Sequence, residues 1–295
     1  MQHEERTASL RGPLGSTTSV PVLVSVIIPT RNSAATLERC LRSLRQQTYP
    51  RIESVVVDNS SKDQTRDIAT RLADRVASGG PERSAQRNQG AQLASGNYLL
   101  FIDADMELSE RVVEDCVLRM AGCDALIIPE VTLGESWVAK VRRIERESYR
   151  NSYLFEAARL VRKDVFETLG GYETRLTGLE DYDFEAKLEE HGYAVGHAEE
   201  EILHHEENLD LGRFLRKRAY YAQGLQLYAQ LHPTRAPLQF GVNRILFYAR
   251  KSGMSTSAMM QVIALKALEH VAILLHRVSS PVWGKEQAGD VYSAS

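Results

Sequence analysis

The sequence predicts an α/β fold, with a mostly parallel sheet flanked by helices and a helical C-terminal extension. In the first half of the chain, short apolar runs that suit buried strands alternate with stretches whose apolar residues recur every three to four positions. This alternation is typical of a parallel sheet covered by helices on both faces. The strand-like runs end in polar residues, and ligands of such sheets bind at the carboxyl ends of the strands.

The individual elements follow from local patterns. Continuous apolar or β-branched runs predict strands, and Pro29 is expected to end the first of them. The predicted strands cover residues 22–28, 52–57, 98–102, 125–129 and 201–203. Apolar residues at helical spacing predict helices, the first of them behind a Ser33 cap. The predicted helices cover residues 37–44, 63–73, 87–94 and 109–120.

Composition indicates an ordinary globular protein. The 295 residues are 43% hydrophobic and 25% charged, which suits one large domain plus an appendage. A net charge of −3 argues against a nucleic-acid partner, which would require a broad basic excess. Cys40, Cys116 and Cys123 lack metal-ligand spacing, so we expect small buried side chains in a reduced, cytoplasmic protein. Residues 1–20 lack the apolar core of a signal peptide and are expected to form a mobile leader.

No segment is expected to cross a membrane. The best candidate, residues 259–275, is interrupted by Gln261, Lys266, Glu269 and His270. It falls short of the ~20 apolar residues that a spanning helix needs.

Two carboxylates follow the predicted strand at 98–102. Asp103 and Asp105 are two positions apart, so at a strand end both can face one divalent cation that prefers oxygen ligands and shares them with a phosphate. Acidic residues after a strand are also common turn formers, so the pair alone does not establish a metal site.

Five ordered segments resemble the family 2 glycosyltransferases of the GT-A fold. They are residues 26–32 (VIIPTRN), 56–65 (VVDNSSKDQT), 85–90 (AQRNQG), 101–105 (FIDAD), and 160–183, which contains GGY and GLEDYD. The resemblance covers about residues 22–208. It implies a Rossmann-like GT-A catalytic domain over 21–208, with a nucleotide-sugar half at 21–130 and an acceptor half at 131–208. The remainder is expected to form a helical extension at 209–280 and a mobile tail at 281–295.

The resemblance implies a nucleotide-sugar pocket. Asp58, at a strand end, can accept hydrogen bonds from a uracil or ribose, and in this family that position reads the base; Asn59 stands where Asp is frequent and also suits a turn cap. Arg87 and Asn88 are predicted to open a helix, which suits a phosphate or ribose, although a solvated helix start is the alternative. The expected donor-binding residues are Pro29, Thr30, Asn32, Asp58, Arg87, Asn88, Asp103 and Ala104.

The resemblance also assigns catalytic roles at a helix start that follows Gly178. Asp181 is expected to be the general base, Glu180 to hold the acceptor hydroxyl, and Asp183 to be structural. Acids at a helix N-terminus are also stabilised by the helix dipole, which is the alternative reason for their presence.

A histidine beyond this helix completes the metal shell in many relatives. His204 is preferred here, with His205 as the alternative, so the expected ligands are Asp103, Asp105 and His204. An imidazole beside carboxylates favours Mn²⁺ over Mg²⁺.

The C-terminal third contains two helix-like patterns. Arg213, Arg216, Lys217 and Arg218 lie among Phe214, Tyr220 and Tyr221. This basic pattern suits either a peripheral contact with an anionic membrane, which the aromatic residues slightly favour, or a solvated face from which a cation reaches the donor diphosphate. The second pattern places Leu268, Val271, Ala272 and Leu275 on one stripe, which is more typical of a core or homodimer contact than of a membrane anchor.

These features predict a metal-dependent, inverting glycosyltransferase that moves a sugar from a nucleoside-diphosphate sugar, with UDP favoured, to a hydroxyl acceptor. A lipid-linked, cell-envelope or secondary-metabolite glycan precursor is the expected acceptor class. A processive synthase is disfavoured because the chain lacks a Gln-x-x-Arg-Trp motif. The alternatives are a sugar-phosphate nucleotidyltransferase, which needs a glycine-rich loop that residues 29–32 do not provide, and a non-catalytic nucleotide-sugar-binding protein.

Overall fold

The computed structural model describes residues 21–207, 209–240, 244 and 254–279. The predicted leader at 1–20 and tail at 281–295 lie outside the described residues.

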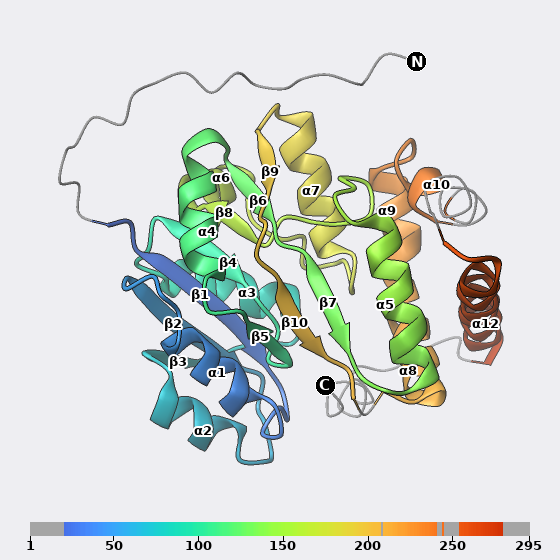
Figure 1. The fold of residues 1–295 in the computed structure, drawn as a ribbon, viewed down its shortest axis with the longest axis horizontal. Helices are drawn as coiled ribbons and strands as arrows, with labels where there is room; N and C mark the ends of the chain where they lie inside the picture. Colours follow the sequence, from blue (N-terminus) through green and yellow to red (C-terminus); the bar gives the residue numbers. More distant parts are fainter. Residues whose placement is uncertain (1–20, 208, 241–243, 245–253, 280–295) are drawn as a thin grey trace.

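A seven-stranded sheet forms the centre of the protein (Figure 1). Its order is β3 (Arg75–Ser78), β2 (Ile52–Asp58), β1 (Val24–Thr30), β4 (Tyr98–Phe101), β8 (Leu160–Arg162), β6 (Ala125–Ile127) and β9 (Val195–His197). The first four strands are parallel, as are β6 and β9, whereas β8 runs antiparallel to both of its neighbours. The predicted mostly parallel sheet is therefore confirmed.

Helices cover both faces of this sheet because alternate residues of its buried strands point to opposite sides. Val26 and Ile28 pack in one cluster with α1 (Leu37–Arg45), α2 (Thr65–Leu72) and α4 (Val112–Arg119). Ile27 packs in the other cluster. The helices of that second face are α3 (Arg83–Leu93), α6 (Lys163–Thr168) and α7 (Glu180–Glu190). Of the cysteines, Cys40 and Cys116 are buried as predicted, and Cys123 is half-buried.

A second, three-stranded sheet was not predicted. It has the order β5 (Met106–Leu108), β10 (Ile202–His205), β7 (Glu130–Leu133). The pairing sets His204 opposite Met106, one residue from Asp105. Residues that are 99 positions apart in the sequence are thereby brought to the edge of the main sheet.

The C-terminal helices pack on this side of the molecule (Figure 1). They are α8 (Leu211–Tyr221), α9 (Leu225–Leu231), α10 (Ala236–Gln239) and α12 (Thr256–Ser279). α12 and α8 share an apolar cluster with α5 (Trp137–Tyr149), a helix that was not predicted. The predicted helical extension is confirmed.

Two predicted boundaries are wrong. Pro29 lies inside β1, because alternate residues of β1 bond to β2 and β4, and β4 pairs with β1 only as far as Ile27. The missing N–H of Pro29 thus faces a side where β4 has already ended. α3 begins at Arg83, so Arg87 and Asn88 lie within the helix and do not open it.

The expectation that residues 259–275 fall short of the length and apolarity of a spanning helix is also wrong, whereas the prediction that no segment crosses a membrane stays a prediction. Thr256–Leu275 is long and apolar enough, by length and composition, to cross a membrane. The polar residues that were expected to break this segment do not interrupt the helix. The expected core contact of the α12 stripe is wrong as well, because Leu268, Val271 and Leu275 are exposed, while Val262 and Leu265 face the protein. The homodimer alternative stays a prediction.

Candidate active site

Asp103 lies two residues beyond the end of β4. Its carboxylate is held by arginines of α3. Arg87 Nη2 donates to Asp103 Oδ1 at 2.7 Å, and Arg83 Nη1 lies 3.6 Å from Oδ2. Burial alone would raise the pKa of Asp103, but Arg87 and Arg83 hold it well below its usual range. Asp103 is therefore a carboxylate at neutral pH, with both oxygens beside guanidinium groups.

Asp105 is buried and faces His204 across the small sheet. His204 Nε2 lies 3.2 Å from Asp105 Oδ2. Burial lowers the pKa of His204, but the Asp105 carboxylate more than offsets this effect, and the pKa rises to about 9. His205 points to the other face of β10, where its ring nitrogens meet Glu107 and Glu207. Of the two predicted histidines, His204 is thus the one beside Asp105.

The region around Asp105 and His204 contains an unsatisfied carboxylate oxygen that a divalent cation could use. Asp105 Oδ1 is buried and has no hydrogen-bond partner among the described residues. A free carboxylate oxygen beside an imidazole suits such a cation. In the described part of the chain, no three His, Cys, Asp or Glu side chains form a ready metal cluster, because Asp103 is turned to Arg83 and Arg87. Asp105 fits the cation as it stands, and His204 would fit it once its ring loses the proton that the raised pKa retains; Asp103 is engaged elsewhere.

Arg87 connects the β4 edge to the start of α7. Its Nη1 donates to Glu180 Oε1 at 3.0 Å, while Nη2 holds Asp103, and the guanidinium lies over the Tyr172 ring, 5.7 Å from its centroid. Glu180 is buried and does not line the pocket described below, so the structure does not place it where it was expected to meet an acceptor. The Asn88 amide binds the backbone N and O of Tyr172. Arg87 and Asn88 thus hold α3, α7 and the Tyr172 segment together.

A separate group of predicted donor residues, Thr30, Asn32 and Asp58, lies at the ends of β1 and β2. Asp58 Oδ1 accepts from Thr30 Oγ1 at 3.1 Å, and Oδ2 accepts from the Ser61 backbone N–H at 3.0 Å. Asn32 has a positive φ of 50°, and its side chain accepts from the Lys62 N–H. Neither these residues nor Pro29 and Ala104 line the main pocket.

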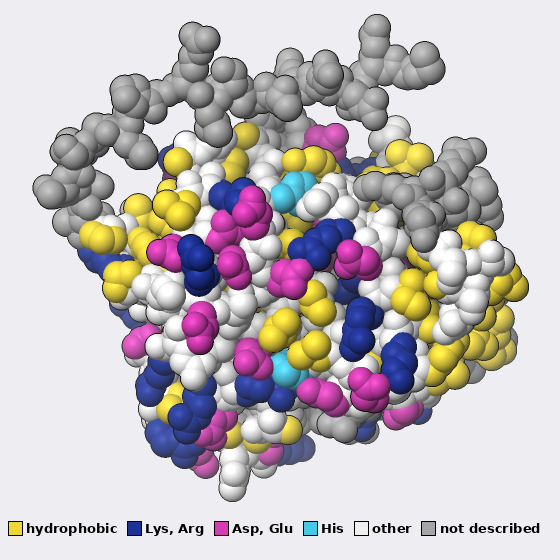
Figure 2. Space-filling model, in the orientation of Figure 1, with side chains coloured by type: hydrophobic (Ala, Val, Ile, Leu, Met, Phe, Trp, Pro, Cys, Tyr) yellow, Lys and Arg dark blue, Asp and Glu magenta, His cyan; other side chains and the backbone are white. Residues whose placement is uncertain are grey.

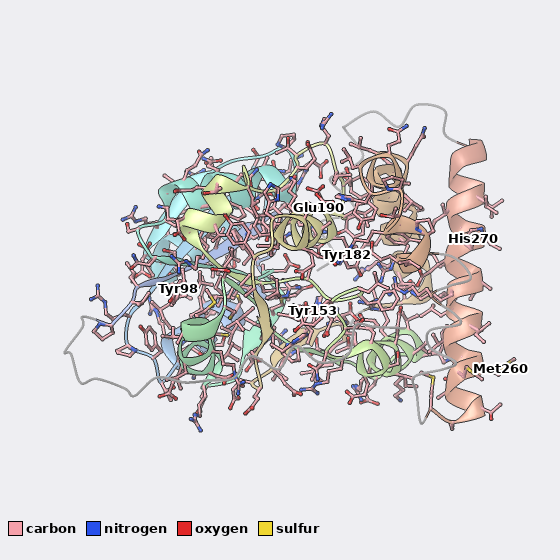
Figure 3. All side chains as sticks on the ribbon, turned by 90° about the horizontal axis from the view of Figure 1, so that it is seen from above. Tyr98, Tyr153, Tyr182, Glu190, Met260 and His270 are labelled. Atoms are coloured by element: carbon pink, nitrogen blue, oxygen red, sulfur yellow. The ribbon has the colours of Figure 1, made fainter. Side chains whose placement is uncertain are left out.

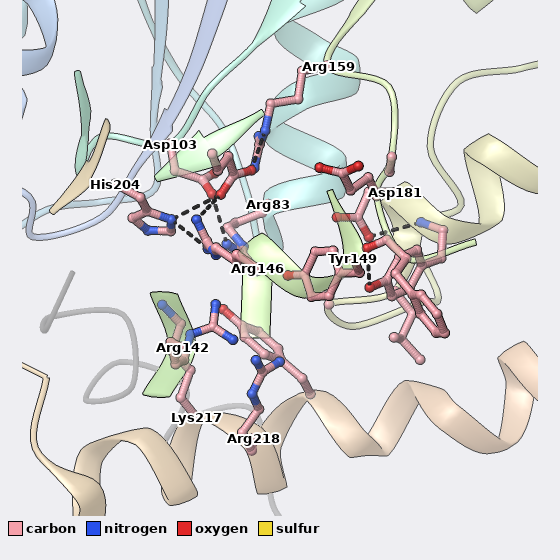
Figure 4. Close-up of a pocket in the computed structure, with 18 of the residues that line it drawn as sticks. Arg83, Asp103, Arg142, Arg146, Tyr149, Arg159, Asp181, His204, Lys217 and Arg218 are labelled. Atoms are coloured by element: carbon pink, nitrogen blue, oxygen red, sulfur yellow. Dashed lines mark hydrogen bonds and ion pairs between the residues drawn. The ribbon is translucent and has the colours of Figure 1, made fainter. Parts of the chain in front are cut away.

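A pocket of about 310 Å³ opens between the β4 edge and the C-terminal helices (Figure 4). Asp103 and His204 lie on one side of it and Asp181 on another. Cations from six parts of the chain also line it: Arg83, Arg87, Arg142, Arg146, Arg159, Lys217, Arg218, Arg244 and Lys266. Six carboxyl groups line the same pocket: Asp103, Glu130, Glu156, Asp181, Glu206 and Glu269. The cations therefore outnumber the acids by nine to six, and this positive excess suits an anionic ligand.

Asp181 reaches the pocket because the chain turns sharply before α7. Gly178 has a φ of +74°, and an added Cβ would lie 2.4 Å from the Tyr221 ring, so this position requires glycine. Asp181 is half-buried, and burial together with the neighbouring Glu180 raises its pKa to about 6. Asp183 points away and binds His232 Nε2 at 2.8 Å and Lys187 Nζ at 2.7 Å, in agreement with its predicted structural role.

Several pocket residues were missed. Arg142, Arg146 and Tyr149 come from α5, and Glu130 pairs with both Arg146 and Arg159. The apolar residues Val138 and Val141, three positions apart, were the signal for α5 that could have been read. No sequence pattern indicates that its arginines turn toward β7.

α8 presents two of its four cations to the pocket. Lys217 and Arg218 line it, whereas Phe214 and Tyr220 are buried, and Tyr220 Oη donates to Glu82. The reason given for a membrane contact of α8 is therefore wrong, because two of its three aromatic residues pack inside the protein.

The comparisons with known proteins agree on one class. Residues 25–171 match the sequence model of glycosyl transferase family 2. The glycosyltransferase AglE of Haloferax volcanii is 28% identical over 229 residues, which are 70% of this chain and 74% of AglE. A PGL/p-HBAD biosynthesis glycosyltransferase of Mycobacterium bovis is 32% identical over 181 residues, 55% of this chain and 68% of that protein.

Solved structures share the fold. The mannosyltransferase PcManGT from Pyrobaculum calidifontis, solved with GDP-Man and Mn²⁺, superposes with a TM-score of 0.61 at 17% identity over 88% of each chain. Residues 1-349 of TarS of S. aureus, solved with UDP-GlcNAc, give a TM-score of 0.52 at 20% identity, covering 85% of this chain and 81% of that TarS chain. The fold is that of the GT-A glycosyltransferases. The chain belongs to glycosyl transferase family 2 and is a glycosyltransferase.

Proposed function

We propose that this glycosyltransferase moves one sugar per encounter from a nucleoside-diphosphate sugar to a hydroxyl group, with inversion at the anomeric carbon. The observation that carries the proposal is Asp181, a half-buried carboxylate that faces a cation-lined pocket of about 310 Å³. A base on one side and positive charge on another are what this displacement requires.

Asp181 acts as the general base. It takes the proton of the acceptor hydroxyl while the oxygen attacks the anomeric carbon, and the bond from that carbon to the diphosphate oxygen breaks on the opposite face. The configuration is therefore reversed. A pKa of about 6 keeps Asp181 mostly ionised at neutral pH yet basic enough to accept the proton.

A divalent cation, when bound, neutralises charge on the departing diphosphate. Asp105 and His204 are the residues that would hold it, and the imidazole favours Mn²⁺ over Mg²⁺. The Mn²⁺ complex of PcManGT supports a metal in this fold. In this chain, Arg83 and Arg87 orient Asp103, and the Lys217 cation faces the pocket from α8.

The donor nucleotide is assigned to the ends of β1 and β2, where Pro29, Thr30, Asn32 and Asp58 gather. The carboxyl edge of parallel strands is the usual site for such a ligand. UDP is favoured through the resemblance around Asp58 and the UDP-GlcNAc complex of TarS, while the GDP-Man complex of PcManGT makes GDP the competing choice. Membership of the glycosyltransferases sets aside the nucleotidyltransferase and the non-catalytic binding protein.

The decisive experiment incubates the purified protein with Mn²⁺, a panel of UDP-, GDP- and dTDP-sugars, and hydroxyl acceptors. Proton NMR of the product reports the anomeric configuration. We expect transfer from one nucleotide class with inversion. A retained configuration would exclude the role given to Asp181, and a failure of every donor would exclude the proposed reaction.

A further inference from the structure

Helix α12 turns a continuous apolar face away from the rest of the protein. Met260, Val271 and Leu274 are exposed by 59%, 52% and 50%. Figure 3 shows α12 at the edge of the molecule with Met260 pointing outward, and Figure 2 shows apolar side chains gathered at the same edge. Only 11% of the apolar window in Thr256–Leu275 is buried. The outer face of α12 is defined here by Met260, Leu268, Val271 and Leu274.

The charged residues of the helix lie on the opposite side. Lys266 and Glu269 are the only Asp, Glu, Lys or Arg residues between Thr256 and Leu275. Lys266 Nζ lies 2.7 Å from Glu145 Oε1 and 2.9 Å from Glu269 Oε1, and both side chains are mostly buried. The outer face therefore carries no Asp, Glu, Lys or Arg, although His270 is exposed beside it.

The size of this face limits what can cover it. A 24-residue helix is ~36 Å long, and a stripe ~10 Å wide along it offers on the order of 360 Å². A stable dimer needs roughly 800 Å² from each partner, together with a polar rim that supplies hydrogen bonds. A patch of this size on a monomer is nevertheless large enough to be functional.

We propose that the outer face of α12 binds the surface of a phospholipid bilayer, with the helix lying parallel to the membrane plane. An uncharged apolar stripe can enter the boundary between headgroups and acyl chains without leaving a polar partner unsatisfied. A spanning orientation is disfavoured, because it would pull Lys266 and Glu269 out of their ion pairs with the protein. The helix rests on the membrane while its inner face stays docked.

This contact brings the pocket close to the lipid. Lys266 and Ile273, on the inner side of α12, line the pocket. A helix is ~10–12 Å thick, so the pocket and the membrane lie on opposite sides of one helix. The membrane contact itself does not depend on the proposed reaction.

The test is flotation of the full-length protein with neutral phosphatidylcholine vesicles. We expect the wild type to float and the double variant Leu268→Gln/Leu274→Gln to bind roughly tenfold to a hundredfold more weakly, since two leucines lose their transfer to lipid. The control is Leu93→Gln/Leu118→Gln, which changes the same residue types at 37% and 69% exposure, against 39% and 50% on α12. Wild-type protein that does not float, or a Leu268/Leu274 variant that floats as well as the control, would overturn the proposal.

Two further measurements test whether the contact involves the α8 cations or a second copy of the protein instead of the outer face of α12 and lipid. Binding through an uncharged face should persist at high salt, whereas loss of binding at high salt would assign the contact to the α8 cations instead. Analytical ultracentrifugation without lipid should show a monomer. A dimer that the Leu268/Leu274 variant dissociates would show that a second copy covers this face.

A readout that tolerates small folding defects uses tryptophan emission. Val271→Trp should shift to shorter wavelength when vesicles are added, because the ring enters an apolar environment. Leu118→Trp should not shift. Equal behaviour of the two variants would contradict the proposal even if the Leu268/Leu274 variant proved unstable.

Discussion

At the scale of single residues, the site depends on two neighbouring carboxylates with different surroundings. Glu180 is buried and paired with Arg87, whereas Asp181 faces the pocket with a raised pKa of about 6. Asp183, two positions on, is bound by His232 and Lys187. The start of α7 thus contains three acids with different roles. Glu180 forms an ion pair with Arg87, Asp181 is the proposed base, and Asp183 binds His232, which follows α9.

We expect Asp181→Asn to lower turnover by ~10²–10⁴, the usual contribution of a general base, while donor affinity stays within a few-fold. Single-turnover kinetics and equilibrium donor binding measure the two quantities separately. Asp183→Asn is the control, because it should lower thermal stability and leave the turnover of the folded protein nearly unchanged. Loss of donor affinity in Asp181→Asn would move this residue to the phosphate shell.

The pH dependence of kcat/KM should report the same carboxylate. Asp181 must be unprotonated to act as base, so activity should rise with pH through about 6 and then level off. In Glu180→Gln the acidic limb should move to lower pH, because the variant removes a negative charge next to Asp181 and leaves Arg87 with Asp103 as its remaining carboxylate partner. An acidic limb that persists unchanged in Asp181→Asn would belong to another group.

At the scale of elements, α8 and α12 form one wall of the pocket. α8 directs Lys217 inward and Arg216 outward, and α12 is fixed by a buried cluster in which Glu145 meets Lys266, Arg244 and Arg142. Glu145 is fully buried, and these three cations compensate its charge. The helices are therefore held by charge as well as by apolar contacts.

Lys217→Gln should lower kcat/KM for the donor about ten- to a hundredfold, the cost of one charge-assisted hydrogen bond to a phosphate. Arg216→Gln is the matched control on the same helix and should have little effect, since Arg216 is exposed. Steady-state kinetics with a soluble acceptor measures both. Equal effects of the two variants would argue against a donor contact of Lys217.

Glu145→Gln should loosen α12. Removing one partner of a buried ion cluster leaves uncompensated charge, which costs ~3–5 kcal/mol. Hydrogen exchange should then increase along α12 more than in the central sheet, and the melting temperature should fall. Glu147→Gln, at an exposed position of α5, is the control. Unchanged exchange in α12 would show that apolar packing alone holds this helix.

At the scale of the whole molecule, donor and metal binding should stabilise the fold together. A ligand at a hundred times its Kd adds ~2.7 kcal/mol to the free energy of unfolding. We expect a melting-temperature increase with Mn²⁺ and the correct nucleotide sugar, its loss on chelation, and a smaller increase in Asp105→Asn. A full increase in the presence of chelator would exclude metal-dependent donor binding.

The cytoplasmic location of the protein stays a prediction.

The sequence by itself determined the alternation of strands and helices and the polar strand ends. Buried strands show themselves as apolar runs because both of their faces are covered, and the residues after each strand are local in sequence. Asp58 and Asp103 could therefore be placed at strand ends, whereas Asp181 was singled out only by the resemblance to family 2. The choice between His204 and His205 could not, because it depends on the register of β10 against β5.

Only the tertiary structure decided which side chains face the pocket and which face of α12 faces outward. Arg87 and Asn88 were read from a local helix start, but their partners Glu180 and Tyr172 lie more than eighty positions away. The Leu268–Val271 stripe looked like a core face by spacing alone. Instead, Val262 and Leu265 pack inward and Lys266 meets the buried Glu145, so the apolar stripe lies on the outside.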